Sequence, residues 1–583
     1  MPRDWVIAAP WHDRDGLAQR LGTSPIVAQV LYNRGLTDES ASRQFLAPQM
    51  TDILPPEAIP ATLEAADRIA AAISAGRKIV LYGDYDVDGI TGVSILWHCL
   101  KLAGANVDFY IPRRLEEGYG VNSEAIDTIA NDGAGMIVTV DCGVTALEPA
   151  EKAKRRGVEF IITDHHEPHR AADGTAIVPE AVVVHPTVWK TGPSNYANPH
   201  LSGAGVALKL AWAVAQKLSN SQKVRPEFRD FLIDAVGLAA LGTIADVVPL
   251  IGENRVIAHY GLRGLAQSRI PGVRALIATA KLSGKSLSGY DIGFKLAPRL
   301  NAIGRMGHAQ IAVELLTRAS DQEAVLIAQN LEKQNGDRQR LQSRIAKDAR
   351  EMVISQRQND DTIRGIVLHS AGWHAGVIGI VASKVTEEFG RPAVMIATEN
   401  GVGQGSGRSV CNFALHEAFA HCGQHLISYG GHARAAGLKV ETAKVADFTA
   451  AFQERAGKLL TPADLRPKLT LDDEIGLDDL CPELVTAFER LEPFGAGNTT
   501  PRLASGWLEL YGEPRAVGTN KSHLQVTLTD GRHRCKGIAF GMAASAASLQ
   551  DHRRCRVAFE PIINEWQGRR TAEMQIIDFQ FPA

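Results

Sequence analysis

Short runs of apolar and β-branched residues alternate with amphipathic segments from about residue 78 onward. The apolar runs that predict strands occupy residues 78–84, 106–112, 135–141, 159–165 and 181–186. Segments with helical spacing, such as residues 91–104 and 123–133, lie between them. Strands separated by helices of this length predict a parallel sheet with helices on both faces.

The pattern changes further along the chain. Residues 187–204 are rich in Gly, Pro, Ser and Asn and predict a loop, after which a helical region continues to residue 250. Residues 320–357 carry apolar positions at helical spacing on a heavily charged surface, which predicts an exposed connecting helix. A second α/β unit is expected from residue 365. Short strands from about residue 465 predict a small β-barrel, for which an OB-fold is the leading candidate.

These patterns predict an α/β protein of several domains, since 583 residues are too many for one hydrophobic core. The expected parts are a parallel-sheet catalytic domain, a long connecting helix, a second α/β domain and a C-terminal barrel. The predicted boundaries are 1–60 for an N-terminal segment, 61–318 for the catalytic domain, 319–357 for the helix, 358–462 for the second domain and 463–583 for the barrel.

Composition narrows the class of protein only partly. The formal net charge is −3, from 62 Lys+Arg against 65 Asp+Glu, which neither supports nor excludes a nucleic-acid partner. Seven dispersed cysteines without a CxxC pair argue against a disulfide framework and a structural zinc site. No apolar run is long enough to span a membrane, and charges occupy the start of the chain where a signal peptide is apolar. We therefore expect a reduced, cytoplasmic protein with no membrane partner.

Acidic and histidine residues gather where the predicted strands end. In open parallel sheets, ligands bind at the carboxyl ends of the strands. Any one of these aspartates can be explained as a turn residue or a helix cap, but the joint pattern is far more specific. The residues concerned are Asp84, Asp86 and Asp88 after the first strand, Asp141 after the third, and Asp164, His165 and His166 after the fourth.

Asp246 lies in an otherwise apolar stretch, where a buried carboxylate needs a partner. A cation is the simplest such partner. Oxygen-rich ligands with one or two imidazoles suit Mn²⁺ or Mg²⁺ better than zinc or copper. Two such ions about 3.5–4 Å apart can activate an attacking water and stabilise the leaving oxygen of a phosphoester. The sequence thus predicts a phosphoesterase site with two cations.

Four segments resemble, in order, the motifs of the DHH phosphoesterase superfamily: GDYDVDG (83–89), VDCG (140–143), TDHH (163–166) and GTIADVVPL (242–250). The resemblance implies a catalytic role for His166 with Asp164, in which His166 contacts the scissile phosphate or assists proton transfer. The metal ligands that it implies are Asp86, Asp88, Asp141, His165 and Asp246, with Asp84 joining or supporting them.

Three further segments carry candidate phosphate-binding residues. Glycines allow backbone amides to approach an anion, and an arginine adds a bidentate charged contact. A plain tight turn and ordinary surface salt bridges are the alternatives. The candidates are Ser406 and Arg408 in GQGSGRSV (403–410), His432 in GGHARAAG (430–437), and Arg299, Asn301 and Arg305 in APRLNAIGRM (297–306).

Together with GWHAGVIGIVASKV (372–385) and LEPFGAGN (491–498), these segments resemble the RecJ family of bacterial exonucleases from about residue 20 to the end of the chain. The resemblance implies a DHH catalytic domain, a DHH-associated domain and an OB-fold. It implies 5′→3′ degradation of single-stranded DNA to mononucleotides with Mn²⁺ or Mg²⁺, in recombination and repair. Ser406, Arg408 and Arg299 would anchor the 5′ phosphate, and a helicase and a single-strand-binding protein would be partners.

Two other functions stay open on the sequence alone. One is a DHH enzyme for short oligonucleotides, cyclic dinucleotides or polyphosphate, and the other is a catalytically dead DNA-binding scaffold. The long connecting helix and the barrel count against the first, and the full set of acids counts against the second. Trp507, Tyr511 and Trp566 are candidates for base stacking, although such residues more often belong to the core or rim of a small barrel.

Overall fold

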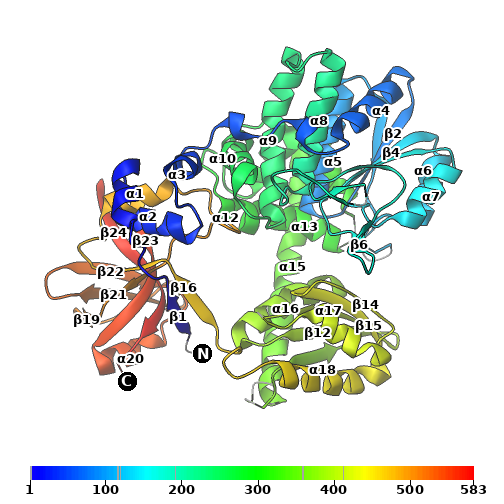
Figure 1. Cartoon of the computed structure of the whole chain (residues 1–583). Helices are drawn as coiled ribbons and strands as arrows, with labels where there is room; N and C mark the ends of the chain where they lie inside the picture. Colours follow the sequence, from blue (N-terminus) through cyan, green and yellow to red (C-terminus); the bar gives the residue numbers. More distant parts are fainter. Residues whose placement is uncertain are drawn as a thin grey trace. The chain divides into compact units, whose positions relative to one another are not determined.

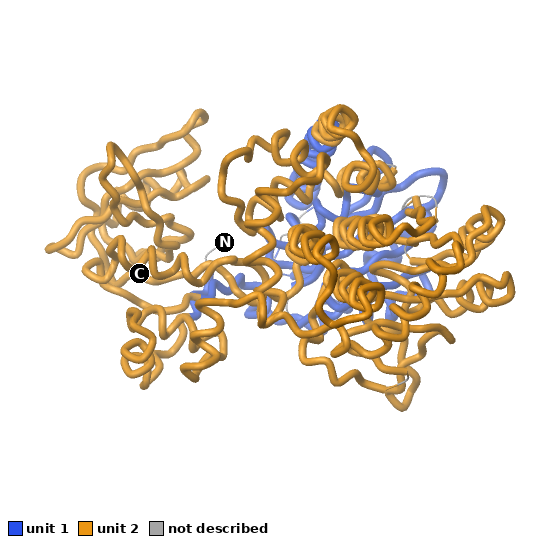
Figure 2. The backbone as a smooth tube through the Cα atoms, turned by 90° about the horizontal axis from the view of Figure 1, so that it is seen from above, with its two compact units in different colours: residues 1–6, 333–470 blue, residues 7–332, 471–583 orange. Residues whose placement is uncertain are grey.

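The chain forms two compact units in a computed structural model. One unit comprises residues 1–6 and 333–470, and the other comprises residues 7–332 and 471–583 (Figure 2). The boundary at residue 332 falls inside the helix α15 (Asp321–Ser355), which the charged amphipathic pattern predicts. The structure describes residues 3–113, 117–118, 120–190, 192–306, 308–356, 360, 362–410 and 412–582, without the side chains of residues 305 and 306.

The first α/β domain is built on a five-stranded parallel sheet in the order β3-β2-β4-β5-β8, and the five predicted strands are confirmed. Helices α4, α5 and α8 cover one face, and α6 and α7 cover the other (Figure 1). Burial on both faces explains the long apolar runs of β2, β4, β5 and β8. The strands are β2 (Lys78–Gly83), β3 (Val107–Tyr110), β4 (Ala134–Val140), β5 (Glu159–Thr163) and β8 (Val182–Val184), and the helices are α4 (Thr62–Ser74), α5 (Val87–Leu102), α6 (Ser123–Asn131), α7 (Leu147–Arg155) and α8 (Gly203–Ser219).

Further helices extend the core on the α5 and α8 side of this sheet. The segment before α8 is mostly loop, as predicted, with only short strands. The remaining helices are α9 (Pro226–Ala245), α10 (Gly252–Ala266), α11 (Pro271–Thr279), α12 (Gly289–Asp291), a π-helical turn (Ile292–Leu296), α13 (Ala297–Met306) and α14 (Gln310–Thr317). The short strands are β6 (His169–Arg170), β7 (Ala176–Ile177), β9 (Val188–Trp189) and β10 (Gly192–Pro193).

The C-terminal residues form the predicted barrel. Strand β23 pairs with β19 and β24, and β22 pairs with β24, so the path β23-β19-β21-β22-β24 closes on itself. The strands are β17 (Asp473–Ile475), β18 (Leu503–Ser505), β19 (Leu508–Leu510), β20 (Arg515–Val517), β21 (His523–Thr529), β22 (Arg534–Ala539), β23 (Arg554–Trp566) and β24 (Arg569–Gln580), with helices α19 (Pro482–Glu489) and α20 (Ser545–His552).

The N-terminal segment packs on this barrel, although the two ends of the chain are far apart in sequence (Figure 1). The helices that pack there are α1 (Arg14–Leu21), α2 (Pro25–Asn33) and α3 (Glu39–Leu46), whereas the strand before them, β1 (Asp4–Ile7), pairs with β16 (Lys468–Leu471). Leu17 and Leu31 share a hydrophobic cluster with Phe488 of α19. The buried Arg255 of α10 donates hydrogen bonds to the carbonyl oxygens of Phe45 and Leu491, 2.9 Å each, and so ties both segments to the first domain.

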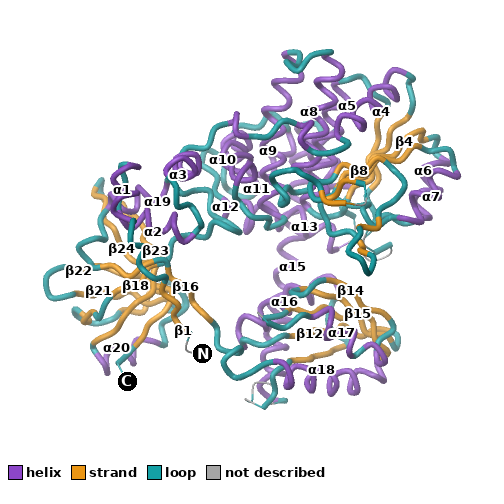
Figure 3. Tube along the Cα trace, viewed as in Figure 1, coloured by secondary structure: helices purple, strands orange, loops and turns teal. Residues whose placement is uncertain are grey.

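The second α/β domain has a five-stranded mixed sheet in the order β11-β12-β13-β15-β14 (Figure 3). The second half of α15 packs with α16 on one face, while α17 and α18 cover the other. The elements are β11 (Ile366–Ser370), α16 (Ala375–Phe389), β12 (Ala393–Glu399), β13 (Val402–Arg408), α17 (Leu415–His421), β14 (Ser428–Gly431), β15 (Ala435–Glu441), α18 (Val445–Leu459) and β16 (Lys468–Leu471). Among the described residues, no helix is both long and apolar enough to cross a membrane.

The glycine-rich segment in this domain is a strand, β13, rather than a loop or tight turn. Its glycines lie where helices and strands pack closely on one face of the sheet. A Cβ atom on Gly405 would lie 2.6 Å from Leu438, and one on Gly407 would lie 3.0 Å from Phe419. The glycines therefore serve close packing, and the residues between them point to the opposite face.

Candidate metal centre

The acidic and histidine residues meet at the carboxyl edge of the parallel sheet. Asp84 follows β2, Asp141 follows β4, and the DHH sequence follows β5, while Asp246 comes from the end of α9. Three sets have ligand atoms within 4.8 Å of one another: Asp84 with Asp86 and Asp141, Asp141 with His165 and His166, and Asp88 with His165 and Asp246. Asp141 and His165 each belong to two sets, which suits two neighbouring cations.

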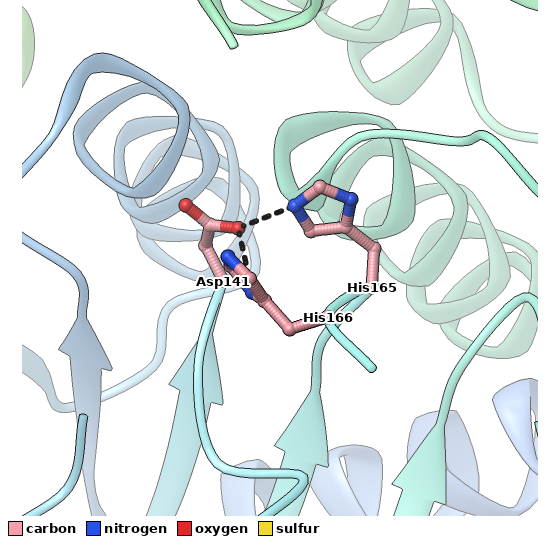
Figure 4. Close-up of side chains that lie close together, drawn as sticks. All are labelled: Asp141, His165 and His166. Carbon is pink, nitrogen blue, oxygen red and sulfur yellow. Dashed lines mark ion pairs between the residues drawn. The ribbon is translucent and has the colours of Figure 1, made fainter. Parts of the chain in front are cut away.

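The rings of His165 and His166 both face the carboxylate of Asp141 (Figure 4), and His165 also lies close to two further acids. Its Nε2 atom is 3.1 Å from Oδ1 of Asp141, 3.6 Å from Oδ2 of Asp246 and 3.8 Å from Oδ2 of Asp88. Nε2 of His165 and Oδ1 of Asp141 are buried and have no hydrogen-bond partner among the described residues. A buried polar atom without a partner costs about 1–3 kcal/mol. The cluster therefore fits a bound cation, which would satisfy both atoms.

The backbone of Asp141 adopts a strained conformation that places its carboxylate in the cluster. Asp141 has a φ of +63°, in the left-handed region that residues other than glycine rarely adopt. Two glycines from other segments leave room for the acids. A Cβ atom on Gly203 would lie 2.4 Å from Oδ1 of Asp141, and one on Gly242 would lie 2.4 Å from Oδ1 of Asp88. The sequence carried no separate signal for these two glycines.

Backbone amides hold two of the acids in place. The carboxylate of Asp88 accepts hydrogen bonds from the amides of Gly203 (2.6 Å) and Ala204 (3.0 Å), at the start of α8. Oδ1 of Asp86 accepts from the amides of Asp88 (3.0 Å) and Gly89 (3.2 Å) and so caps α5. The capping interpretation thus holds for Asp86, and it also fixes the side chain beside the cluster.

Three carboxyl groups of the cluster have raised pKa values. Burial raises the pKa of Asp88 to about 7, with Asp86 adding to the effect, and burial together with Asp88 raises the pKa of Asp246 to about 8. Burial and the neighbouring Asp88 also raise the pKa of Asp141 well above its ordinary value. Like charges in one buried site disfavour each other's ionised form, and a cation removes that penalty.

The two histidines differ in their environment. Burial and the neighbouring His166 lower the pKa of His165 to about 3, so its imidazole is neutral and suited to metal ligation. Burial opposes the charge on His166, but the hydrogen bond to Asp164 outweighs it and raises the pKa of His166 to about 9. Nδ1 of His166 donates to Oδ1 of Asp164 at 2.8 Å.

The carboxylate of Asp164 is held by hydrogen bonds from His166 and from backbone amides. Oδ1 also accepts from the amides of His165 (2.7 Å) and His166 (3.1 Å), and Oδ2 accepts from the amide of Val144 (2.8 Å). Burial alone would raise the pKa of Asp164, but the bond from His166 lowers it below its ordinary value. Both oxygens are engaged, and Asp164 belongs to none of the three sets, so its geometry fits a residue that positions the histidines. The catalytic role expected for Asp164 with His166 stays a prediction.

His185 supports the same loop and was missed by the sequence analysis. This buried histidine follows β8, and its Nε2 donates to the carbonyl oxygen of His166 at 2.9 Å. Its Nδ1 accepts from the amide of Thr187 at 3.1 Å, which fixes the tautomer. The only signal in the sequence was a histidine directly after an apolar strand.

Replacing Asp164 with asparagine is expected to lower the turnover number about 10- to 100-fold without loss of metal binding. The variant keeps the shape of the side chain but removes the charge that holds the proton on His166. The pKa of His166 should therefore fall, and the alkaline limb of the pH–rate profile should move to lower pH. A loss of metal affinity in this variant would instead make Asp164 a ligand.

Helix α13 carries three predicted phosphate contacts and lies against the β2–α5 loop. A Cβ atom on Gly304 would lie 2.9 Å from the carbonyl oxygen of Tyr85. Nε of Arg299 donates to Glu332 at 2.5 Å, so its guanidinium is engaged on α15. Asn301 is half-buried on the same helix. The side chain of Arg305 lies outside the described residues.

Ser406, Arg408 and His432 lie in the other unit, at the sheet of the second α/β domain. Nη1 of Arg408 donates to Oγ of Ser406 at 3.2 Å. Gly379 of α16 gives these side chains room, because a Cβ atom there would lie 2.9 Å from Oγ of Ser406. His432 is exposed in the connection between β14 and β15, and its amide donates to the carbonyl oxygen of Ala435 at 2.8 Å.

Family models match three parts of the chain. They are described as the DHH family N-terminal domain (residues 78–239), the DHHA1 domain (362–458) and the RecJ OB domain (471–578). The single-stranded-DNA-specific exonuclease RecJ of Bacillus subtilis is 38% identical over 98% of this chain and 70% of its own length. The chain belongs to the RecJ family. The resemblance found in the sequence, and the fold class expected from it, are thereby confirmed.

Solved structures of RecJ from Thermus thermophilus agree with this assignment. The structure in complex with Mn²⁺ is 29% identical, with a TM-score of 0.83, and the match covers 100% of this chain and 80% of that one. The structure in complex with Mg²⁺ is 28% identical, with a TM-score of 0.76, and covers 100% and 79%. Both ions are those that the oxygen-rich ligand set favours.

Proposed function

We propose that this RecJ-family chain is a metal-dependent exonuclease that degrades single-stranded DNA from the 5′ end to 5′-mononucleotides. One observation carries the proposal: five acids and two histidines converge at one sheet edge, with Asp141 and His165 shared between ligand sets. A shared carboxylate holds two cations close together, which is the arrangement that phosphodiester hydrolysis uses. The family's role in recombination and repair is proposed for this chain as well.

The cofactor is Mn²⁺ or Mg²⁺, and we propose two ions. Asp84 and Asp86 would hold one ion and Asp88, His165 and Asp246 the other, with Asp141 between them. When bound, the pair supplies a water of lowered pKa and stabilises the charge on the leaving oxygen.

His166 would act on the substrate phosphate. The raised pKa keeps its ring protonated at neutral pH, and Asp164 holds the proton on Nδ1. Nε2 then lies on the opposite side of the ring, where it can donate to a phosphate oxygen or deliver a proton to the leaving group. His185 holds the backbone of His166 and thereby the direction of this donor.

Ser406 and Arg408 would bind the terminal 5′ phosphate, with His432 of the same unit as a further contact. Arg299, Asn301 and Arg305 of the other unit remain proposed contacts to DNA phosphates. Arg408 already donates to Ser406, so a hydroxyl and a guanidinium are presented side by side on β13. An arginine and a hydroxyl together recognise phosphate oxygens by charge-assisted hydrogen bonds. A site for the terminal phosphate would explain action from one end of the strand.

Arg408→Ala is expected to weaken the preference for 5′-phosphorylated over 5′-hydroxyl DNA about 10- to 100-fold, since a charge-assisted hydrogen bond contributes about 1.5–3 kcal/mol. The preference is measured as the ratio of kcat/KM for the two substrates. Arg340→Ala is the matched control, because Arg340 is an exposed arginine of α15 in the same unit. An unchanged ratio in Arg408→Ala would remove this residue from the phosphate site.

The barrel offers stacking surfaces for single-stranded DNA. Trp507 and Tyr511 are 42% and 47% exposed, so neither is a core residue of the barrel. The guanidinium of Arg554 lies 5.4 Å from the ring centre of Trp507, and that of Arg534 lies 3.6 Å from that of Tyr511. Paired aromatic and cationic groups suit a strand that exposes both bases and phosphates. Trp566, at the β23–β24 hairpin, is 72% exposed and is a further candidate.

The domain boundaries predicted from the sequence remain proposals: 61–318, 319–357, 358–462 and 463–583. The family matches at 78–239, 362–458 and 471–578 each fall inside one of these domains. A cytoplasmic location and association with a helicase and a single-strand-binding protein are likewise proposed from family membership.

The test is product analysis with a single-stranded oligonucleotide and a blunt duplex of the same sequence. In the presence of Mn²⁺, the single strand should yield 5′-mononucleotides while the duplex stays intact. Cleavage confined to dinucleotides would indicate a small-substrate phosphoesterase, and binding without cleavage would indicate a scaffold.

A further inference from the structure

Two exposed aromatic side chains lie on the segment that leads into α13 and have no part in the function described so far. Tyr290 and Phe294 are 62% and 69% exposed, and their rings are stacked with centroids 4.7 Å apart and 23° between their planes. Single exposed apolar residues are common on protein surfaces, but an exposed stacked pair marks a binding surface more strongly. Phe294 lies on the π-helical turn that precedes α13, and such turns are frequent at functional sites.

The pair lines a cavity whose wall includes Ala245 and Val247, the residues on either side of the proposed ligand Asp246. This cavity has a volume of about 600 Å³ and is also lined by Phe494 and Arg502. Val247 directly follows the proposed ligand Asp246, is 68% exposed and has a φ of +61°. A β-branched residue rarely adopts that backbone conformation, so the backbone at Val247 is strained while its apolar side chain is exposed.

Charges near the pair are largely balanced. Nζ of Lys295 lies 5.7 Å from the ring centre of Tyr290 but also 2.7 Å from Oδ1 of Asp291. Nε of Arg502 lies 3.1 Å from Oε1 of Glu560. The cavity therefore exposes aromatic ring faces beside two cationic side chains, each of which is paired with a carboxylate, so no strong positive potential is expected there. Such a surface suits the face of a nucleobase beside a phosphate backbone.

We propose that Tyr290 and Phe294 form a stacking platform for bases of the single-stranded DNA on the 3′ side of the scissile phosphodiester. The inference rests on the proposed function. An exonuclease that releases mononucleotides from the 5′ end has one nucleotide on the 5′ side of the scissile bond. A platform whose cavity reaches the chain neighbours of Asp246 would therefore meet the remaining strand. Stacking on ring faces is tolerant of sequence, as a processing enzyme requires.

The first test measures binding without hydrolysis, in the presence of chelator. Single-stranded oligonucleotides carry 2-aminopurine at successive positions from the 5′ end, and its fluorescence is quenched when it stacks. One or two adjacent positions should be quenched by the wild-type chain. Tyr290→Ala and Phe294→Ala should each remove this quenching and weaken binding at least about fivefold, as alanine substitution of a stacking residue does.

Phe294→Trp should restore the quenching, whereas Phe294→Leu, which keeps an apolar side chain without a ring, should not. Trp189→Ala is the matched control, because Trp189 is also exposed and has a lysine, Lys190, 5.4 Å from its ring centre. Trp189 lines a different cavity, so the Trp189→Ala protein should bind DNA with wild-type affinity. Melting temperatures should not change in any variant, since exposed side chains contribute little to stability.

The second test separates the platform from the metal centre. Hydrolysis of thymidine 5′-(p-nitrophenyl phosphate), which has no base on the 3′ side of the scissile bond, should keep its wild-type rate in Tyr290→Ala, while KM for a 20-nucleotide strand should rise at least about fivefold. Unchanged affinity and quenching would overturn the proposal and leave the pair as a docking site for an apolar protein segment. Loss of hydrolysis of the p-nitrophenyl ester would also overturn it, by assigning the pair to the metal centre. The binding test remains decisive even if the wild-type chain proves not to hydrolyse DNA.

Discussion

Asp141→Asn is expected to lower the rate of DNA hydrolysis by at least about 10³-fold while leaving the affinity for single-stranded DNA within a few-fold of wild type. Asp141 is the carboxylate shared between two candidate ligand sets, so its loss would affect both proposed ions. Metal ions supply several kcal/mol of transition-state stabilisation, and about 4 kcal/mol corresponds to 10³ in rate. Asparagine is chosen because it preserves the shape and tolerates the φ of +63°.

Asp132→Asn is the control for this experiment. Asp132 lies before β4, at the opposite end of the strand that leads to Asp141, and its side chain is exposed and paired with Lys78. Its activity should match that of the wild type. If Asp141→Asn fails to fold, the residue is structural rather than a ligand. If it retains full activity, the proposed ligand set is wrong.

Manganese affinity is expected to fall at least about 100-fold between pH 8 and pH 6. The raised pKa values of Asp88, about 7, and Asp246, about 8, mean that both carboxyls hold protons on the acidic side of this range in the metal-free protein. A cation needs the ionised forms, so each displaced proton weakens binding up to tenfold per pH unit as the pH falls. Asp141, whose pKa is also raised, adds to the effect.

Calorimetric titration with Mn²⁺ in buffers of different ionisation enthalpy counts the protons released. At pH 7 we expect at least one proton released per chain. Asp246→Asn should bind more weakly and release fewer protons, because one titrating ligand is gone. Affinity that does not change with pH, with no proton release, would mean that the carboxyls are already ionised before the metal binds.

Much of the fold follows from local pattern. The strands of the first domain were predictable because helices cover both faces, which forces continuous apolar runs at 78–83, 134–140 and 159–163. The strand at 402–408 could not be predicted from local pattern. Its glycines leave room for the side chains of Leu438 and Phe419, which lie outside the strand. Packing of the N-terminal helices on the C-terminal barrel was equally hidden, since no local pattern specifies a partner several hundred residues away.

The location of the candidate site could also be predicted from the sequence, but the role of each residue could not. Strand ends located the acids, because parallel strands all place their carboxyl ends at one edge. The roles within the cluster needed coordinates. Asp164 and His165 are neighbours after the same strand. The carboxylate of Asp164 accepts hydrogen bonds from backbone amides and His166, whereas the ring of His165 faces three acids. The exposed pair Tyr290 and Phe294 gave no signal, because aromatic residues in a helical pattern are ordinarily buried.

The central claim is metal-dependent hydrolysis of single-stranded DNA from its 5′ end at the centre built around Asp141. The most direct measurement follows the release of label from a single strand labelled at either end, with Mn²⁺ and with chelator. We predict that a 5′ label appears in mononucleotides from the first turnovers, that a 3′ label appears there only after the strand is consumed, and that chelator stops both. Release from the 3′ end first, or release that continues in chelator, would contradict the account.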